Sequence, residues 1–196
     1  MFNSKFNFTT RITLVIMGLM LIAVIYVPIW SIELNAPQYP EGLSMSIYAN
    51  RIGGNVDIIN GLNHYIGMKT IHDKDFPEFK IIPYLVYFFS LLFILTGVIA
   101  NRKMLYSLFV LFVGFGIVAM TDFWKWEYQY GHDLNPDAAI KVPGMSYQPP
   151  LIGYKRLLNF GAYSMPDIGG WIFILAGLVL LILVWIQLRM LKVVKY

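Results

Sequence analysis

The stretch Lys103-Met-Leu-Tyr-Ser-Leu-Phe-Val-Leu-Phe-Val-Gly-Phe-Gly-Ile-Val-Ala-Met-Thr-Asp122 decides the fold class, because no charged residue lies between its two ends. A run of about 20 apolar residues is long enough to cross the hydrocarbon core of a bilayer as a helix. Three further charge-free runs lie at Arg11–Glu33, Lys80–Arg102 and Asp167–Arg189. We therefore predict an all-α integral membrane protein with four transmembrane helices, forming a single membrane domain over residues 1–196.

The composition supports this class. Of the 196 residues, 58% are hydrophobic and 13% are charged, and the mean hydropathy is +0.61. Soluble domains carry about 25% charged residues. Basic residues precede the first apolar run, as in a signal peptide, but no cleavage site with small residues follows it promptly, so we expect a retained helix.

The distribution of lysine and arginine predicts the orientation. Seven basic residues and no acidic ones lie before the first run, between the second and third runs, and in the C-terminal tail, whereas loops 33–80 and 122–167 hold eight basic and eleven acidic residues. Lysine and arginine are enriched in cytoplasmic loops of membrane proteins. We therefore expect a multi-pass protein of a bacterial inner membrane, with both termini cytoplasmic and both long loops periplasmic. Because the basic residues flank apolar segments, the net charge of +4 does not indicate nucleic-acid binding.

The two long loops are expected to form a small extracytoplasmic cap. Residues Leu43–Tyr48 alternate apolar and polar side chains, Val56–Ile58 is a plausible partner strand, and Asn50–Gly54 would supply the turn. This pattern predicts a short β-hairpin. In the second loop, the third membrane helix is expected to continue through Phe123–Tyr130, and Leu151–Phe160 is expected to form a short interfacial helix.

The cap also holds residues that suit a soft metal. The stretch Asn60-Gly-Leu-Asn-His-Tyr-Ile-Gly-Met-Lys-Thr-Ile-His72 places His64, Met68 and His72 at fourfold spacing on one face of a predicted helix. Imidazole and thioether groups are ligands that Cu(I) accepts. Since the chain contains no cysteine, any metal site would rest on histidine, methionine, carboxylate or backbone ligands.

Helix geometry limits this copper site. On a continuous helix His64 and His72 are about 12 Å apart along the axis, so both can bind one ion only if the helix breaks, and Gly67 is the expected position of a break. A third ligand would come from the second loop, where His132 and Met145 are the candidates. The alternative is an exposed polar helix face that binds nothing, with methionine filling gaps in the packing.

An alternative hypothesis is that residues at the end of the third apolar run take part in electron transfer. Asp122, Trp126 and Tyr130 lie there and could oxidise a membrane quinol and pass electrons to a periplasmic acceptor. The simpler explanation of Asp122 and Glu127, with Trp124 and Trp126, is that they mark the membrane boundary where the span ends. A third reading is a structural scaffold whose cap docks a partner without binding any ligand. No motif in the chain indicates an enzyme.

Four stretches of the chain carry a resemblance to a known family. They are Ala36-Pro-Gln-Tyr-Pro-Glu-Gly-Leu43, Leu62-Asn-His-Tyr-Ile-Gly-Met68, Pro143-Gly-Met-Ser-Tyr-Gln-Pro-Pro-Leu-Ile-Gly153 and Asn159-Phe-Gly-Ala-Tyr-Ser-Met-Pro-Asp-Ile-Gly-Gly-Trp171. The chain resembles a family of small four-span membrane proteins encoded beside atypical (clade II) nitrous oxide reductases. This resemblance implies an accessory role near a periplasmic copper enzyme, in copper handling, maturation, electron supply or partner docking. The leading hypothesis is therefore a membrane-bound accessory protein of nitrous oxide reductase assembly.

Overall fold

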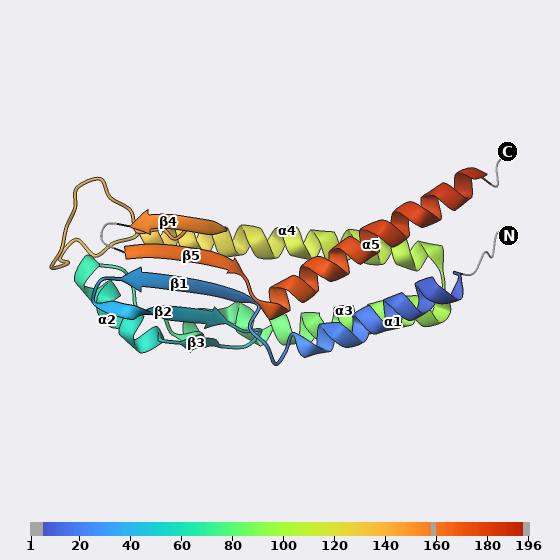
Figure 1. The fold of residues 1–196 in the computed structure, drawn as a ribbon, viewed down its shortest axis with the longest axis horizontal. Coiled ribbons are helices and arrows are strands. Elements are labelled where there is room, and N and C mark those ends of the chain that lie inside the picture. The colour runs from blue at the N-terminus through green and yellow to red at the C-terminus, as the bar shows by residue number, and fades with distance from the viewer. Residues whose placement is uncertain (1–5, 158–159, 194–196) are drawn as a thin grey trace.

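A computed structural model describes residues 6–157 and 160–193 of the chain. It is elongated, with helices at one end and a β-sheet at the other (Figure 1). Within the described ranges the chain forms five α-helices and a five-stranded antiparallel sheet. The expectation of an all-α protein with four membrane spans was therefore wrong.

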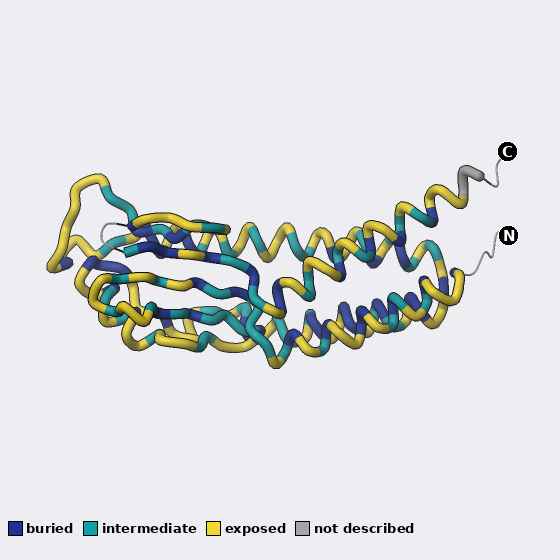
Figure 2. The backbone as a smooth tube through the Cα atoms, viewed as in Figure 1, coloured by how far each residue is buried: buried dark blue, intermediate teal, exposed yellow. Residues whose placement is uncertain are grey.

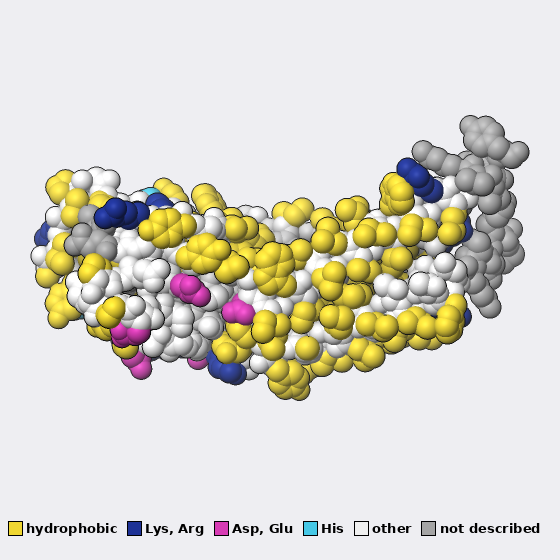
Figure 3. All heavy atoms as spheres, viewed as in Figure 1, with side chains coloured by type: hydrophobic (Ala, Val, Ile, Leu, Met, Phe, Trp, Pro, Cys, Tyr) yellow, Lys and Arg dark blue, Asp and Glu magenta, His cyan; other side chains and the backbone are white. Residues whose placement is uncertain are grey.

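We call the helical end the stem. It consists of α1 (Phe8–Ala23), α3 (Ile82–Ile99), α5 (Ile168–Val193) and the part of α4 (Arg102–His132) up to Thr121. In the part of the chain that the structure describes, three helices, α3, α4 and α5, are long and apolar enough to cross a membrane. They match three of the four predicted runs. Hydrophobic side chains cover the visible face of the stem, whereas acidic side chains lie at the sheet end (Figure 3).

The first predicted span is wrong in its second half. The helix α1 has 16 residues and ends at Ala23, and strand β1 (Trp30–Ala36) begins soon after. Pro28 lies between them and cannot continue a helix, because proline lacks the backbone N–H. From Trp30 the side chains alternate between buried and more exposed positions, which is the period of a strand.

Helices α1 and α3 pack closely because each helix has a glycine that faces the backbone of the other helix. A Cβ atom on Gly18 would lie 2.8 Å from the Ser90 carbonyl oxygen, and one on Gly97 would lie 2.7 Å from the Arg11 carbonyl oxygen. Small residues permit such close helix contacts in membranes. The Ser90 hydroxyl donates to the Gly18 carbonyl at 2.6 Å. The two helices therefore form the best-packed pair of the stem.

We call the other end the sheet module. It comprises the sheet, α2 (Val56–Ile66), the 3₁₀ turns η1 (Asp73–Asp75) and η2 (Pro77–Lys80), residues 122–132 of α4 and the connecting segments. The strand order is β3-β2-β1-β5-β4. Strand β1 lies at the centre, where Trp30 pairs with Ile47 on one side and Pro166 on the other. The other strands are β2 (Tyr39–Ile47), β3 (Ile52–Gly54), β4 (Gly153–Leu157) and β5 (Phe160–Pro166).

Two local predictions in the module need correction. The hairpin exists between β2 and β3, but β3 occupies residues expected in the turn, and the expected partner Val56–Ile58 begins α2 instead. The segment Leu151–Phe160 contains β4 rather than an interfacial helix. The periodicity of a short segment with mixed polarity is compatible with a helix or a strand. Here the segment is a strand because it pairs with β5.

The end of α4 forms the floor of the sheet module. As predicted, α4 continues past Asp122 and ends at His132. The Trp30 ring lies 5.3 Å from the Phe123 ring, and the Trp126 ring stacks on the Tyr130 ring at 5.0 Å. The Trp30 indole N–H also donates to the buried Ser164 hydroxyl at 2.8 Å. Sheet and helix thus share one core, and Figure 2 shows the buried residues along β1 and β5.

Candidate functional sites in the sheet module

The stretch that carries His64 and Met68 is broken where expected. Helix α2 ends at Ile66, and Gly67 adopts a left-handed conformation with φ of +80°. The chain then turns back along α2, because the Asn60 side chain accepts the Ile71 N–H at 2.7 Å and donates to the Ile71 carbonyl at 3.0 Å. The 12 Å separation expected between His64 and His72 on a continuous helix therefore does not apply.

The second loop closes on this turn. The Asn135 N–H donates to the Gly67 carbonyl at 2.8 Å. Lys69, which follows Met68, forms an ion pair with Asp133, which follows His132. The structure thus brings together the two chain segments that hold Met68 and His132.

The five candidate ligands do not share one environment. Met68 is 8% exposed and belongs to the core of the sheet module, and the partly buried Met145 packs against the same core. His64 and His72 are exposed on the module surface. His132 is also exposed, and its ring stacks on the Tyr128 ring at 4.1 Å. Among residues 6–157 and 160–193, no three histidine, aspartate or glutamate side chains gather as a metal-binding group.

The residues considered for quinol oxidation are mainly core residues. Trp126 stacks between Phe123 and Tyr130, at ring distances of 5.9 and 5.0 Å. The buried Tyr130 hydroxyl accepts a hydrogen bond from the Asn63 amide. Asp122 lies on the exposed side of α4. These three side chains therefore do not face one common pocket.

Glu127 is the most unusual polar residue of the module. Its side chain is 0% exposed, and within the described chain neither carboxyl oxygen has a hydrogen-bond partner. The segment Tyr147–Leu151 covers this part of α4. The Tyr147 N–H donates to the Gly131 carbonyl at 2.9 Å, and a Cβ atom on Gly131 would lie only 2.3 Å from the Gln148 backbone.

The environment of Glu127 favours its neutral form. Glu127 lies beyond the charge-free part of α4, inside the sheet module. Burial raises the pKa of its carboxyl group to about 8, although the positive charge of Lys155 acts in the opposite direction. The Lys155 ammonium group donates to the Gln148 carbonyl at 3.0 Å, so the cation lies beside the covering segment. At neutral pH this carboxyl group can therefore hold a proton under the segment.

The local sequence contains no signal that identifies this buried site. Glu127 and Gly131 are four residues apart and lie on one face of α4. An acidic residue where a helix leaves an apolar run is compatible with a membrane boundary and with a buried contact. Only the covering segment, distant in sequence, distinguishes the two.

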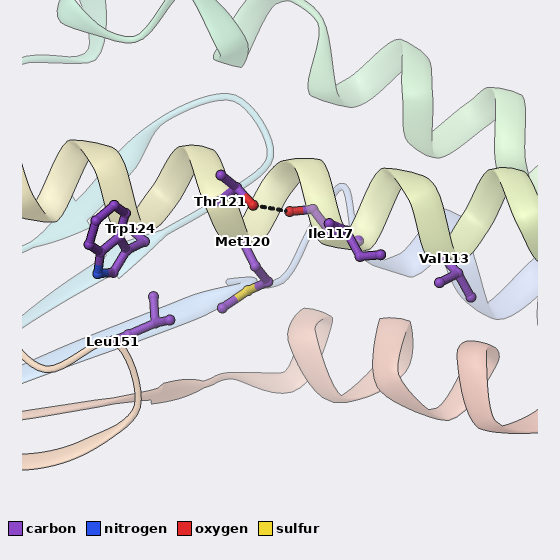
Figure 4. Close-up of a pocket in the computed structure, with 7 residues that line it drawn as sticks. Val113, Ile117, Met120, Thr121, Trp124 and Leu151 are labelled. Atoms are coloured by element: carbon purple, nitrogen blue, oxygen red, sulfur yellow. Dashed lines mark hydrogen bonds between the residues drawn. The ribbon is translucent and has the colours of Figure 1, made fainter.

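An apolar groove of about 590 Å³ runs along α4 where the stem meets the sheet module. Figure 4 shows Val113, Ile117, Met120 and Trp124 on α4, with Leu151 facing them from the other side. The Thr121 hydroxyl donates to the Ile117 carbonyl at 2.7 Å, so it is satisfied within the helix. The lining suits a hydrocarbon chain of a lipid.

Comparison with known proteins gives no family for this chain: no family model, no curated protein and no solved structure matches it.

Proposed function

We propose that this chain is a membrane-anchored accessory protein that presents its sheet module to a protein partner outside the cytoplasm. The observation that carries the proposal is the attachment of the module to the stem. The chain passes from α1 into the central strand β1 and from β5 into α5, while α4 extends under the sheet as one helix. A module attached in this way has a fixed position above the stem, as a docking platform requires.

The charge distribution supports the proposed orientation. Arg11, Arg102, Lys103 and Arg189 lie at the end of the stem far from the sheet, and every acidic residue of the sequence lies between Glu33 and Asp167. By the positive-inside rule, the basic end faces the cytoplasm and the sheet module faces the periplasm or an equivalent space. The apolar surface of α3, α4 and α5 then contacts the bilayer.

The resemblance suggests which partner to test first. It points to a nitrous oxide reductase, a periplasmic copper enzyme, or to another membrane protein of its assembly. The experiment is affinity purification of the tagged chain from the membranes of its native host, with quantification of the reductase in the eluate. A matched control carries the tag on the isolated stem helix α5. Enrichment with the full chain only is expected; equal recovery in both samples would contradict docking.

A second candidate function is Cu(I) binding, and the contact between the two loops favours it. Met68 and Met145 pack in one core next to the turn that carries His132. Two thioethers and an imidazole form a ligand set that Cu(I) accepts. His64 and His72 remain candidates only as surface ligands that pass the ion on.

The copper candidate is tested by metal content after anaerobic loading with Cu(I) and desalting. The double variant Met68→Leu/Met145→Leu removes both thioethers and keeps the apolar volume. Because the volume is kept, each substitution should cost less than about 1.5 kcal/mol of stability. About one copper per wild-type chain and none in this double variant is the expected result. Equal copper in both would show that the methionines are packing residues.

A further inference from the structure

The two edge strands of the sheet, β3 and β4, differ in length and in how far other parts of the chain cover them. Strand β3 has only three residues, and the Ile52 N–H on this edge donates to the Asp73 carboxylate at 2.8 Å. Asp73 belongs to η1, so the edge is short and covered by a neighbouring turn. These are common ways to prevent an edge strand from pairing with another chain.

The opposite edge is longer and more exposed. Strand β4 is the last strand of the sheet and pairs with β5 along its whole length, from Gly153 to Leu157. Its other side has no neighbouring strand in the part of the chain that the structure describes. Tyr154 is 64% exposed, the next two residues are also exposed, and β4 is the exposed strand at the top of Figure 2. An edge strand presents backbone N–H and C=O groups to any extended segment that approaches it.

The charges of β4 determine what can approach. Lys155 and Arg156 are consecutive, so they lie on opposite faces of the strand. Lys155 is exposed but its ammonium group also donates to the Gln148 carbonyl, so one cation lies on the side of the covering segment and the other on the outer face. Elsewhere the two loops of the module are rich in acidic residues. Two copies of β4 would bring like charges together, which opposes self-association through this edge. An acidic strand would instead place opposite charges beside both cations.

Exposed aromatic residues next to this edge could contact the side chains of an incoming strand. Tyr154 pairs in register with Tyr163, which is 37% exposed, so both side chains lie on the outer face of the sheet, where the Tyr154 ring extends over Gly161. Aromatic side chains on neighbouring strands stabilise a sheet. An incoming strand next to β4 would extend this row.

We propose that β4 is a docking edge that accepts an extended, acidic segment of a partner protein as a sixth strand. Backbone hydrogen bonds would provide the affinity, and the two cations and the exposed tyrosines would select the segment. This inference rests on the proposed docking function and specifies the chemistry of the partner.

The first test uses the full-length protein in detergent micelles and a fluorescent peptide of alternating valine and glutamate. Fluorescence anisotropy measures its binding, and a valine–lysine peptide of equal length is the comparison. The acidic peptide is expected to bind and the basic one not to bind. Lys155→Glu with Arg156→Glu is expected to weaken the acidic peptide at least tenfold. The control Lys125→Glu with Lys141→Glu changes the net charge equally at exposed positions outside the sheet and is expected to leave binding unchanged.

A second variant set locates the peptide without removing either cation. The natural chain has no cysteine, so Tyr154→Cys on β4 and Ile52→Cys on β3 each provide one thiol. An acidic peptide whose one cysteine is activated as a pyridyl disulfide is expected to exchange with the thiol of the β4 variant, releasing thiopyridone, at least tenfold faster than with the β3 variant. Equal rates, absent binding, or equal weakening by both pairs of charge reversals would overturn the proposal.

Failure of this inference is separable from failure of the proposed function. If the reductase still co-purifies with the Lys155→Glu/Arg156→Glu variant, the accessory function is supported and the docking edge is overturned. If the acidic peptide binds as expected but the reductase does not co-purify, the edge is supported and the choice of partner is wrong.

Discussion

The stem and the sheet module differ in what determines their structure, although α4 belongs to both. In the stem, each helix is specified by its own run of apolar residues, and only 17% of the most apolar stretch of α4 is buried. In the module, the central strand β1 pairs with β5, about 130 residues later in the chain. Stem structure is therefore encoded locally, whereas module structure depends on contacts between distant segments. Substitutions that distinguish the two regions test this comparison.

The largest effect is expected for Trp30→Ala, because this side chain joins the sheet to α4. It would remove the contact with Phe123 and the hydrogen bond to Ser164. Large-to-small substitutions of core aromatics cost about 3–5 kcal/mol. Thermal unfolding in detergent, followed by limited proteolysis, should show loss of the module at lower temperature. The control is Trp171→Ala, since Trp171 is 54% exposed on α5; an equal destabilisation there would contradict the comparison.

A second prediction compares two glycines of the same helix. Gly131→Ala would push a methyl group into the Gln148 backbone, which lies 2.3 Å from the required Cβ position. Overpacking of this kind costs about 1–3 kcal/mol. Gly116→Ala in the stem meets no atom within 4 Å. It should stabilise the helix by about 0.5–1 kcal/mol, because glycine is a poor helix former.

Unfolding of both variants can be followed by circular dichroism in the same detergent. A lower unfolding midpoint is expected for Gly131→Ala and a higher one for Gly116→Ala. If Gly131→Ala has no effect, the covering segment does not pack on α4 as described.

The same contrast explains what could be predicted from the sequence. The three apolar helices and the continuation of α4 followed from local hydropathy and were confirmed. The break at Gly67 followed from the conformational freedom of glycine. Strands β1, β4 and β5 were missed, because Trp30–Ala36 continues an apolar run, whereas Gly153–Leu157 and Phe160–Pro166 are short and mixed. Only their pairing partners make them strands.

The candidate site was limited in the same way. The proximity of the second loop to the Met68 segment was expected, and the contacts of Gly67 and Lys69 now provide it. The burial of Met68 was not predictable, because helical periodicity placed it on the polar face. The buried state of Glu127 depends on residues 147–151, which no local pattern connects to α4.

A smaller effect is expected for Arg11→Ala in the stem. The Arg11 guanidinium donates to the Gly97 and Val98 carbonyls at 3.1 and 3.0 Å, at the end of α3. Hydrogen bonds from charged groups contribute about 1.5–3 kcal/mol. One bond of this pair is only part-buried and the other is exposed, so the pair should contribute less, about 1 kcal/mol. Arg11→Lys should recover part of the loss. Destabilisation that begins in the module, detected by proteolysis of the loops, would break the proposed separation of the two regions.

The last prediction concerns Glu127→Gln, which should have almost no effect on stability at acidic pH and an increasing effect as the pH rises. Burial raises the pKa of Glu127 from 4.5 in the unfolded chain to about 8 in the folded one. Between these two values the folded protein binds more protons than the unfolded chain, so its stability falls as the pH rises. This contribution is complete below pH 4.5, decreases through the interval, and is lost above about pH 8. Glutamine is neutral throughout and cannot produce this slope.

The measurement is the unfolding midpoint of both proteins between pH 5 and pH 9, with Glu41→Gln as an exposed control. Wild type and Glu127→Gln should unfold at similar temperatures near pH 5, and the variant should become the more stable protein toward pH 9. Lys155 on β4 is the charged group that acts on this carboxyl group. Lys155 partly compensates the ionised carboxylate, so Lys155→Gln in the wild-type background should steepen the decline. A parallel pH profile for wild type and Glu127→Gln would mean that the carboxyl group reaches solvent and that the segment 147–151 does not seal the end of α4.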